Sequence, residues 1–351
     1  MLKLIGKRFL LALVSIFFII IVIAGIIYKA PVDPARISFG QRSDAKTVEQ
    51  LRKKYYLDQP FLEQIYRYLE DLSPLSYHLD SDIRLEDYSI ISTYKTEHSK
   101  LVLKKPYFRN SYISGTPVLP MVFEAMVPSF YLALVAFIIS CILGLSLGLL
   151  SAFYYNKFPD QIFLAFSALG FSIPSYISSI FFALVFGYLM SPILGLNVQG
   201  SLYELNDYGE VKLHWSNIIL PAIALGIRPI AMISQMTRAS ILDIINREYI
   251  RTAVSKGLFP LKIIRDHLFR NALNPILTTV SGWFASLLSG AFFVEYVFNY
   301  RGLGDLTITA LTQFDVPVIL GASIMTVLIF ITVNIVTDIL YAVIDPRIRL
   351  A

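Results

Sequence analysis

The sequence predicts an all-α integral membrane protein with six transmembrane helices, and two observations carry that prediction: an apolar composition and a series of long, nearly uncharged runs. Of the 351 residues, 56% are hydrophobic and only 16% are charged, and the mean hydropathy is +0.62. Soluble domains are about 45–50% apolar and about 25% charged. Because a soluble protein must cover its surface with polar groups, this excess indicates a bilayer as the solvent.

Six apolar segments are long enough to cross that bilayer. A helix rises about 1.5 Å per residue and the hydrocarbon core is about 30 Å thick, so one span needs about 20 residues. Helices are expected because backbone groups in lipid must pair within their own segment. The predicted spans are Phe9–Tyr28, Ser129–Tyr154, Gln161–Met190, Asn217–Ser240, Pro275–Phe298 and Val316–Ile344.

The first span is expected to be retained rather than cleaved as a signal peptide. Its apolar stretch is longer than the roughly 7–15 residues typical of a signal peptide, and no clear small-x-small cleavage site follows it. The predicted organisation is an N-terminal transmembrane helix at 1–28, an extracytoplasmic segment at 29–120, a helical membrane domain at 121–344 and a tail at 345–351.

Basic residues in the short loops predict that both termini are cytoplasmic. Short inner loops carry an excess of Lys and Arg. The loop at 191–216 has Lys212 as its only Lys or Arg, beside several acidic residues. Membrane orientation therefore accounts for the net charge of +5 better than nucleic-acid binding does. The densest basic cluster, between the fourth and fifth spans, consists of Arg247, Arg251, Lys256, Lys262, Arg265 and Arg270.

The long segment between the first two spans divides into two parts. Its first part looks helical, because apolar residues recur at steps of three or four. Residues 75–115 show no clean period and are predicted to be an irregular insertion. The apolar residues of the first part are Val48, Leu51 and Tyr55, then Phe61, Ile65, Tyr68 and Leu69.

No motif for covalent chemistry occurs in the chain. The sequence lacks the G-x-x-x-x-G-K-[ST] phosphate loop, H-E-x-x-H and G-x-S-x-G. Its four histidines are scattered without metal-ligand spacing, and the single cysteine, Cys141, lies in an apolar run. We therefore expect no catalytic residue, no metal site and no cofactor on this chain.

The loop between the fourth and fifth predicted spans has the most informative residue order. Gly257 permits a positive φ at a helix end and Pro260 prevents simple continuation, so we predict a short helix, a glycine stop and a second amphipathic stretch. The small side chains of Thr252, Ala253 and Ser255 would let another protein approach closely. Composition alone favours a simpler interpretation, a basic inner loop that only sets membrane orientation.

This order resembles the EAA loop of ABC importer permeases, in the form used by the dipeptide, oligopeptide and nickel transporter family. That family shows a Y-I-R-T-A-x-x-K-G-L run followed by an R-N-A-x-x-P run. Residues Tyr249–Leu258 and Arg270–Pro275 match both runs at the expected separation. The triplet Arg251-Thr252-Ala253 stands where other importer permeases have Glu-Ala-Ala.

The resemblance covers most of the chain. Val32, Tyr56 and Arg301 depart from it, since they stand where the family has glycine, glycine and proline. The run Ser76–Pro106 looks inserted relative to the family. Further matching runs are Asp33-Pro34, Leu57–Pro60 with Gln64–Tyr66, Met236–Ser240, Gly302–Gly304, Phe314–Val318 and Asp345–Arg349.

The resemblance implies the type I ABC importer permease fold, with 121–344 as the permease domain, in the cytoplasmic (inner) membrane. It implies a heterodimer with a second homologous permease, two cytoplasmic ABC ATPases that bind ATP and Mg, and an extracytoplasmic substrate-binding protein. A short helix around Ala253–Leu258 would couple the chain to one ATPase. The implied coupling residues are Glu248, Tyr249, Arg251, Thr252, Ala253, Ser255, Lys256, Gly257 and Leu258.

Polar residues inside spans are costly and are therefore candidates for the translocation path. Arg228 lies near the middle of the fourth span, directly before Pro229, and would meet a substrate carboxylate. The alternative is an internal ion pair, and the possible partners are Glu124, Glu295 and Asp338.

Three further residues are candidates for the path. Ser172 and Pro174 would break the third span beside it, although an ordinary helix kink is the favoured interpretation. Gln235 is the third, on the same span as Arg228.

The resemblance favours di- and oligopeptides as cargo. Nickel, glutathione or another small solute fits the same fold equally well. A non-transporting assembly protein is an alternative of a different class, and it would have no ATPase partner. A membrane enzyme is disfavoured because the catalytic motifs are missing.

Overall fold

The computed structural model describes residues 2–29, 49, 52–53, 56–79, 85, 87–96, 99–205 and 208–344, most of them helical. The chain forms two compact units. The larger unit comprises Met1–Arg8, Met126–Asp305 and Ile329–Ala351, and the smaller unit comprises Phe9–Ala125 and Leu306–Leu328. The predicted matches at Asp33-Pro34 and Asp345–Arg349, and the apolar positions Val48, Leu51 and Tyr55, lie outside the described residues.

Several helices have the length and composition of membrane spans. Three qualify alone, namely Val118–Phe153, Ser216–Ile245 and Val316–Thr337, and a fourth candidate is the bent pair Phe158–Ser172 and Ser175–Leu189. Leu10–Ile26 and Pro275–Leu288 are shorter apolar helical stretches. The chain is thus mostly helical, with three or four candidate spans by length and composition among the described residues, while six spans stay a prediction.

The third predicted span is broken rather than kinked. Helix α6 (Phe158–Ser172) ends before Ile173, whose backbone is extended, and α7 (Ser175–Phe182) starts after Pro174, with a bend of 110° between the two helical arms. Our expectation of an ordinary kink at Ser172–Pro174 was wrong. A residue before proline is pushed out of the helical region, so Ile173 cannot continue α6.

The second arm continues from α7 into a π-helical turn, η2 (Ala183–Leu189), and the short α8 (Ser191–Leu194). A small hairpin of β4 (Tyr203–Leu205) and β5 (Val211–Leu213) follows. These elements all belong to the larger unit.

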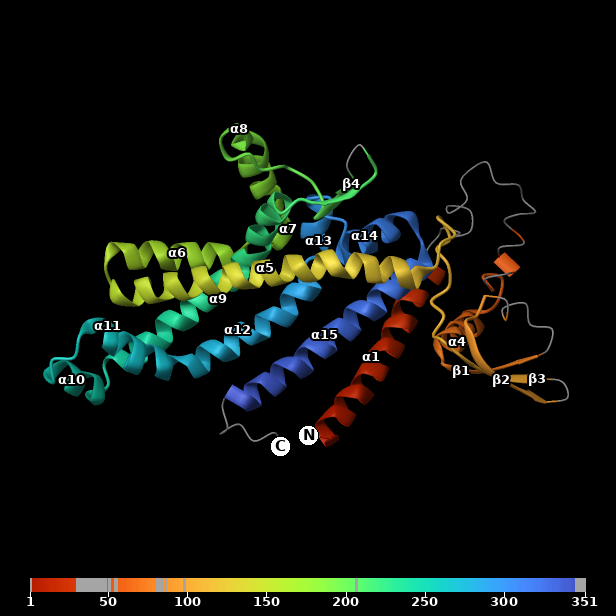
Figure 1. Cartoon of the computed structure of the whole chain (residues 1–351), viewed down its shortest axis with the longest axis horizontal. Helices are drawn as coiled ribbons and strands as arrows, with labels where there is room; N and C mark the ends of the chain where they lie inside the picture. The colour runs from red at the N-terminus through yellow and green to blue at the C-terminus, as the bar shows by residue number, and fades with distance from the viewer. Residues whose placement is uncertain are drawn as a thin grey trace. The chain divides into compact units, whose positions relative to one another are not determined.

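Helix α9 (Ser216–Ile245) is the central element of the larger unit, and α6, α7 and α12 (Arg270–Gly290) contact it (Figure 1). Helix α5 (Val118–Phe153) approaches it most closely through two glycines. A Cβ on Gly144 would lie 2.8 Å from Ile233, and one on Gly148 would lie 2.5 Å from the Ser234 carbonyl oxygen. Small residues at helix contacts are the usual device for close packing in membranes.

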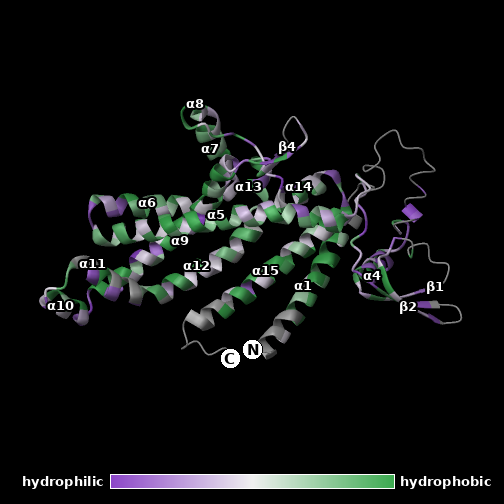
Figure 2. Ribbon diagram, viewed as in Figure 1, coloured by the Kyte–Doolittle hydropathy of each residue, from purple (hydrophilic) through white to green (hydrophobic). Residues whose placement is uncertain are grey.

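The fifth predicted span, Pro275–Phe298, also differs in its bounds. The described helix α12 starts at Arg270 and ends at Gly290, and a separate short helix, α13 (Phe292–Val297), follows. After it come α14 (Leu303–Gln313) and the long α15 (Val316–Ile344). In Figure 2 the hydrophilic residues of this unit gather around α10 (Glu248–Ser255) and α11 (Pro260–Ile263).

The smaller unit holds α1 (Leu2–Lys29) from Phe9 onward, α4 (Phe61–Leu72) and a three-stranded sheet. The apolar periodicity of Phe61, Ile65, Tyr68 and Leu69 is confirmed, since α4 packs these residues against α1 and the first turns of α15.

The prediction of an irregular segment at 75–115 was wrong. It contains β1 (Leu75–Leu79), β2 (Ile90–Thr96) and β3 (Ser99–Lys104), which are all antiparallel in the order β1-β3-β2. That this segment is inserted relative to the family stays a prediction.

A buried ion pair fastens α4 to the chain that leads into α5. Arg109 Nε donates to Asp71 Oδ2 at 2.7 Å, and the Tyr88 hydroxyl donates to Asp71 Oδ1 at 2.5 Å. Burial alone would lower the pKa of Arg109, but the adjacent Asp71 carboxylate raises that pKa above its ordinary value, so the guanidinium stays charged.

Candidate functional site: a helical hairpin and two arginines of α9

The predicted coupling helix is present as α10 (Glu248–Ser255), a few residues earlier than the expected Ala253–Leu258. Arg247 precedes it in an extended conformation, and Lys256 closes it. Gly257 has φ +73°, so the predicted glycine stop is confirmed. A residue with a side chain is strained in this region, which explains the glycine.

One face of α10 is part of the internal core. Ile250 and Ala253 are buried in a cluster that includes Ile241 of α9 and Leu268 and Ala272. This corrects one expectation: Ala253 does not offer a small side chain to another protein, because it packs inside the chain. We call α10 and α11 together the helical hairpin. The turn η3 (Ile264–Phe269) continues from α11 directly into α12, so a helical path joins this hairpin to the membrane helices.

The other face of α10 is open. Half-buried Leu258 closes the turn, where its N–H donates to Ala253 O at 3.3 Å. Val254 and Phe259 are also exposed, to 60% and 70%, and the sequence analysis did not single them out. Nothing in the sequence separated them from the other apolar residues of this loop, such as Ile250, which is buried. The exposed predicted coupling residues are Glu248, Tyr249, Arg251, Thr252, Ser255, Lys256 and Gly257.

Local hydrogen bonds hold the hairpin. Thr252 Oγ1 donates to Glu248 O at 3.1 Å and Ser255 Oγ to Arg251 O at 2.9 Å, so both hydroxyls are returned to the helix backbone. The Asn271 side chain of α12 donates to the Tyr249 hydroxyl at 3.4 Å. The open face of this short helix therefore carries apolar and charged side chains together.

Arg238, near one end of α9, is fully engaged. Its Nε and Nη2, two nitrogens of the guanidinium group, donate to the two carboxylate oxygens of Asp160 on α6, each at 2.8 Å. Asp160 also accepts from Ser151 Oγ at 2.5 Å and from the Asn156 backbone at 2.9 Å. The Tyr155 ring lies 5.3 Å from the guanidinium carbon. This bidentate, buried pair joins α5, α6 and α9.

Arg228, ten positions earlier on α9, is different. It is half-buried, its guanidinium carbon lies 5.6 Å from the centre of the Phe171 ring, and its Nε is buried without a hydrogen-bond partner among the described residues. No described side chain forms an ion pair with it. The predicted alternative of a pair with Glu295 was therefore wrong, and the Asp338 side chain lies outside the described residues.

Glu295 instead caps the start of α14. Its Oε2 accepts from the Gly304 backbone at 2.7 Å and from Asp305 at 3.3 Å. A Cβ on Gly302 would collide with this carboxylate, and one on Gly304 with the backbone of Phe292. The two glycines of the Gly302–Gly304 run are thus explained by close packing.

The other path candidates lie near Arg228 in the chain or on its helix. Ser172 is exposed and donates to the Ala168 carbonyl at 2.8 Å, and Pro174 starts α7 after the break. Gln235 is half-buried and lies seven residues after Arg228, hence on the same helix face. Phe171, which packs on Arg228, was not identified from the sequence.

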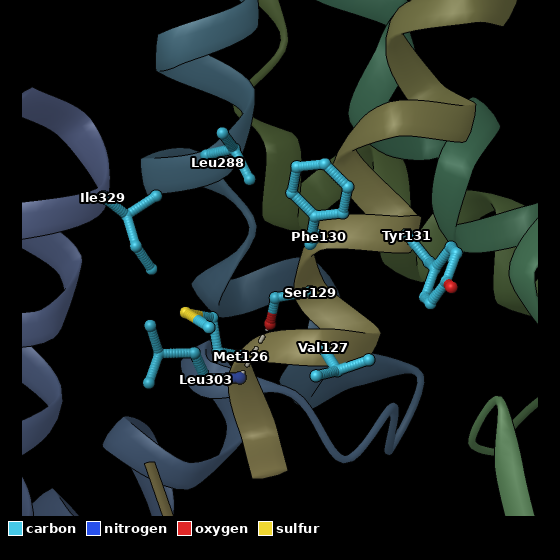
Figure 3. Close-up of a pocket in the computed structure, with 8 residues that line it drawn as sticks. All are labelled: Met126, Val127, Ser129, Phe130, Tyr131, Leu288, Leu303 and Ile329. Atoms are coloured by element: carbon cyan, nitrogen blue, oxygen red, sulfur yellow. Dashed lines mark hydrogen bonds between the residues drawn. The ribbon is translucent and has the colours of Figure 1, made fainter. Parts of the chain in front are cut away.

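A cavity of about 350 Å³ lies in the larger unit, beside the part of α5 that begins at Met126 (Figure 3). Its lining is mostly apolar, and its polar side chains are Tyr131 and Ser129, whose Oγ accepts from the Leu303 backbone at 2.7 Å. This cavity therefore offers mainly apolar contact. It is lined by Met126, Val127, Ser129, Phe130, Tyr131, Leu288, Leu303 and Ile329.

Among the described residues, no group of three His, Cys, Asp or Glu side chains is placed to hold a metal ion.

The chain is similar to known transport proteins. Over its whole length the chain is 28% identical to the glutathione transport system permease protein GsiC of Escherichia coli strain K12, covering 99% of both chains. The GsiC protein of Shigella flexneri serotype 5b is similar to the same extent. Among solved structures, an amino acid ABC transporter covers 63% of this chain and 92% of its own, at 16% identity and a TM-score of 0.46.

Two family profiles match. Residues 1–76 match the N-terminal segment of binding-protein-dependent transport system membrane components. Residues 144–350, more than half of the chain, match the binding-protein-dependent transport system inner membrane component. The chain therefore belongs to the ABC transporter family of binding-protein-dependent inner membrane permeases.

Proposed function

We propose that this chain is one of two homologous permease subunits of an ATP-driven importer of di- and oligopeptides, and that α10 couples it to an ATPase. Family membership implies a multi-pass transport permease rather than an enzyme, with ATPase and substrate-binding partners. The observation that carries the coupling role is the structure of the hairpin: one buried face, one open face and a fixed glycine stop.

Orientation follows from the charge of the hairpin. Its exposed basic residues include Arg247, Arg251 and Lys256, which favours a cytoplasmic location for α10 and for both termini. In that orientation the open face of α10 meets the nucleotide-binding subunit. Val254 and Phe259 fit an apolar groove, while the charged side chains surround it at the rim, as in a typical protein interface.

The mechanical role depends on rigidity. ATP-driven closure of two ATPases moves the seated α10, and the helical path through α11, η3 and α12 passes that movement to the membrane helices. The buried side of α10 also contacts α9 through the core around Ile241 and Ile250. Movement of the hairpin therefore biases the packing of both α9 and α12, the requirement for alternating access.

Arg228, Ser172, Pro174 and Gln235 are the proposed path residues. An arginine near the middle of a membrane helix, whose buried Nε has no hydrogen-bond partner among the described residues, is costly unless a ligand satisfies it. The carboxylate of a peptide matches the guanidinium geometry. Glutathione, the solute in the name of the GsiC relatives, is itself a small peptide with free carboxylates, and it is the second candidate cargo.

Coupling is tested by replacing Gly257 with Val. A Cβ at this position would meet no atom within 4 Å, but a β-branched residue cannot adopt φ +73° without strain of about 1–2 kcal/mol. We expect normal membrane levels, at least tenfold lower uptake and ATPase activity no longer stimulated by substrate. Uptake is measured in proteoliposomes that contain the whole transporter.

The matched control is Gly209→Val. Gly209 has φ +78° and equally open surroundings, but it lies in the loop before β5. If both variants transport equally well, at equal protein levels, the coupling role of α10 is wrong. Cargo is assigned separately by comparing uptake of a dipeptide, glutathione and nickel by the unmodified transporter.

A further inference from the structure

The three-stranded sheet of the smaller unit has an unusual distribution of side chains. Cross-strand partners point to the same face of a sheet. On one face the rows are Leu75–Leu103–Ser92 and Tyr77–Leu101–Tyr94, and neither contains a charge. We call the five large residues of these rows the tyrosine–leucine face: Leu75, Tyr77, Tyr94, Leu101 and Leu103.

The opposite face carries the polar residues, and part of it is buried. Its rows are Ser76–Val102–Thr93 and His78–Lys100–Lys95. Ser76, His78 and Lys104 are almost inaccessible, and His78 is bonded to the Ser76 hydroxyl at 2.8 Å. The Lys104 ammonium lies 3.3 Å from the centre of the Tyr88 ring. Part of the polar side of this sheet is thus buried within the smaller unit, as the apolar side of a soluble sheet normally would be.

The tyrosine–leucine face is correspondingly open. Tyr94 is 73% exposed and Tyr77 is 62% exposed, and Leu75 is more than half exposed. Contiguous exposed apolar surface marks a contact with a protein or a membrane. The packing of α4 and the side chains of the two rows distinguish a protein contact from a membrane contact.

Helix α4, which leads into the sheet, packs against two apolar helices of the smaller unit, α1 and α15. Its Ile65 and Tyr68 are buried in one cluster with Ile20 of α1 and with Leu320 and Ile324 of α15. Ile20 is inside the apolar stretch Leu10–Ile26, and Leu320 and Ile324 are inside the candidate span Val316–Thr337. An amphipathic helix seated there lies in the boundary between headgroups and acyl chains.

The apolar surface of α1 continues onto α4. Ile26 is exposed near the end of α1, and Phe61 at the start of α4 lies 3.5 Å from the Cβ position of Gly25. Leu62 and Tyr66, one helical turn apart on α4, are then 77% and 58% exposed. The lipid-facing stripe of α1 therefore extends to the element that carries the sheet.

The sheet is held rigidly on α4. Only two residues separate α4 from β1, and the Lys104 backbone donates to Pro74 O at 2.9 Å. The Tyr107 backbone donates to Asp71 O at 2.9 Å, beside the Arg109–Asp71 pair. A strand of five residues is about 17 Å long, so the tyrosine–leucine face stays within that distance of a helix at interfacial depth.

We propose that the tyrosine–leucine face rests on the lipid bilayer, at the boundary between headgroups and acyl chains, on the side where α1 ends. Tyrosine beside aliphatic residues is the composition of membrane interfacial belts. The absence of charge from both rows fits lipid better than a protein partner, whose interface would carry a charged rim. The contact would brace α4, and through it the ends of α1 and α15, against the membrane surface.

Site-specific labelling of the whole transporter in nanodiscs tests this contact. In a Cys141→Ser background, Tyr94→Cys and Tyr77→Cys are labelled with an environment-sensitive nitrobenzoxadiazole group. The control is Thr93→Cys, because Thr93 is exposed one position away on the opposite face of the same strand. Doxyl lipids that carry the quencher near the headgroup are then added to the nanodisc.

Labels at positions 94 and 77 are expected to emit at shorter wavelength and to lose about half of their fluorescence to doxyl lipid, at least twice the loss at position 93. Equal quenching at positions 93 and 94, or quenching of position 94 by aqueous iodide alone, would overturn the proposal. So would shielding of position 94 that arises only when a substrate-binding protein is added. Two independent positions guard against a single variant that assembles poorly.

Discussion

Helix α9 carries two arginines, ten residues apart, whose surroundings are opposite. Arg238 gives two parallel hydrogen bonds of 2.8 Å to Asp160, which is itself held by Ser151 and Asn156. Arg228 has a buried Nε that no described residue accepts from, and it packs on Phe171. Both charges are costly in a membrane helix, and among the described residues only Arg238 has a compensating carboxylate.

The two arginines thus differ as a structural charge and a proposed cargo-binding charge. A compensated pair fixes the relative positions of α5, α6 and α9, and its removal should reduce folding. An uncompensated charge has no such role and keeps hydrogen-bonding capacity for a ligand. The same residue type on one helix therefore predicts two different phenotypes.

The largest expected effect is that of Arg238→Ala. Removal of one partner leaves the buried Asp160 carboxylate uncompensated, which costs about 3 kcal/mol. We expect lower membrane levels and a thermal midpoint reduced by several degrees in detergent, measured by size-exclusion chromatography after heating. Arg238→Lys should be intermediate, because an ammonium cannot make the bidentate contact. A stable, abundant Arg238→Ala protein would contradict this assignment.

The two arginines were not equally accessible to sequence analysis. Arg228 could be singled out because it lies alone within an apolar run. Arg238 stood out only as part of the Met236–Ser240 run. Its partner Asp160 lies 78 residues earlier, outside the reach of any local sequence pattern. Charge compensation between distant helices depends on their packing, and a single sequence does not contain that information.

Other differences between sequence and structure have equally local causes. The apolar runs and Gly257 were informative because hydropathy and backbone conformation are properties of short segments. The sheet was missed because its apolar residues point outward and Ser76, His78 and Lys104 point inward, the reverse of the usual pattern. Burial of Ala253 was missed because helix direction within the hairpin decides which face packs inward.

Arg228→Met is expected to have the next largest effect, and on transport alone. Loss of a hydrogen bond to a charged group costs about 1.5–3 kcal/mol, or about 10–100-fold in uptake efficiency. Protein level and thermal midpoint should match the unmodified chain, unlike those of Arg238→Ala. The informative comparison is a dipeptide against its carboxamide, since the amide lacks the charge that Arg228 would bind.

Arg228→Lys is the control for that experiment. It keeps the positive charge, so part of the preference for the carboxylate should remain, whereas Met should abolish it. If Met and Lys variants transport both cargoes like the unmodified protein, Arg228 does not contact cargo.

The smallest expected effects come from the rings that pack on the two arginines. Phe171 lies 5.6 Å from the Arg228 guanidinium carbon and Tyr155 lies 5.3 Å from that of Arg238. A cation–π contact is worth about 0.5–1 kcal/mol at such partly exposed sites, or roughly two- to fivefold. Because Phe171 directly precedes the break at Ser172–Pro174, Phe171→Leu should raise the KM for uptake by that factor without changing the thermal midpoint.

Tyr155→Leu is its counterpart beside the compensated arginine. There the Asp160 bonds already fix the guanidinium, so we expect a small decrease in thermal midpoint and an unchanged KM. Each variant removes a ring that packs on an arginine of α9, and the two arginines differ in their proposed roles. A KM change in Tyr155→Leu as large as that in Phe171→Leu would show that both arginines act on transport through packing, and the division between structural and cargo-binding charge on α9 would fail.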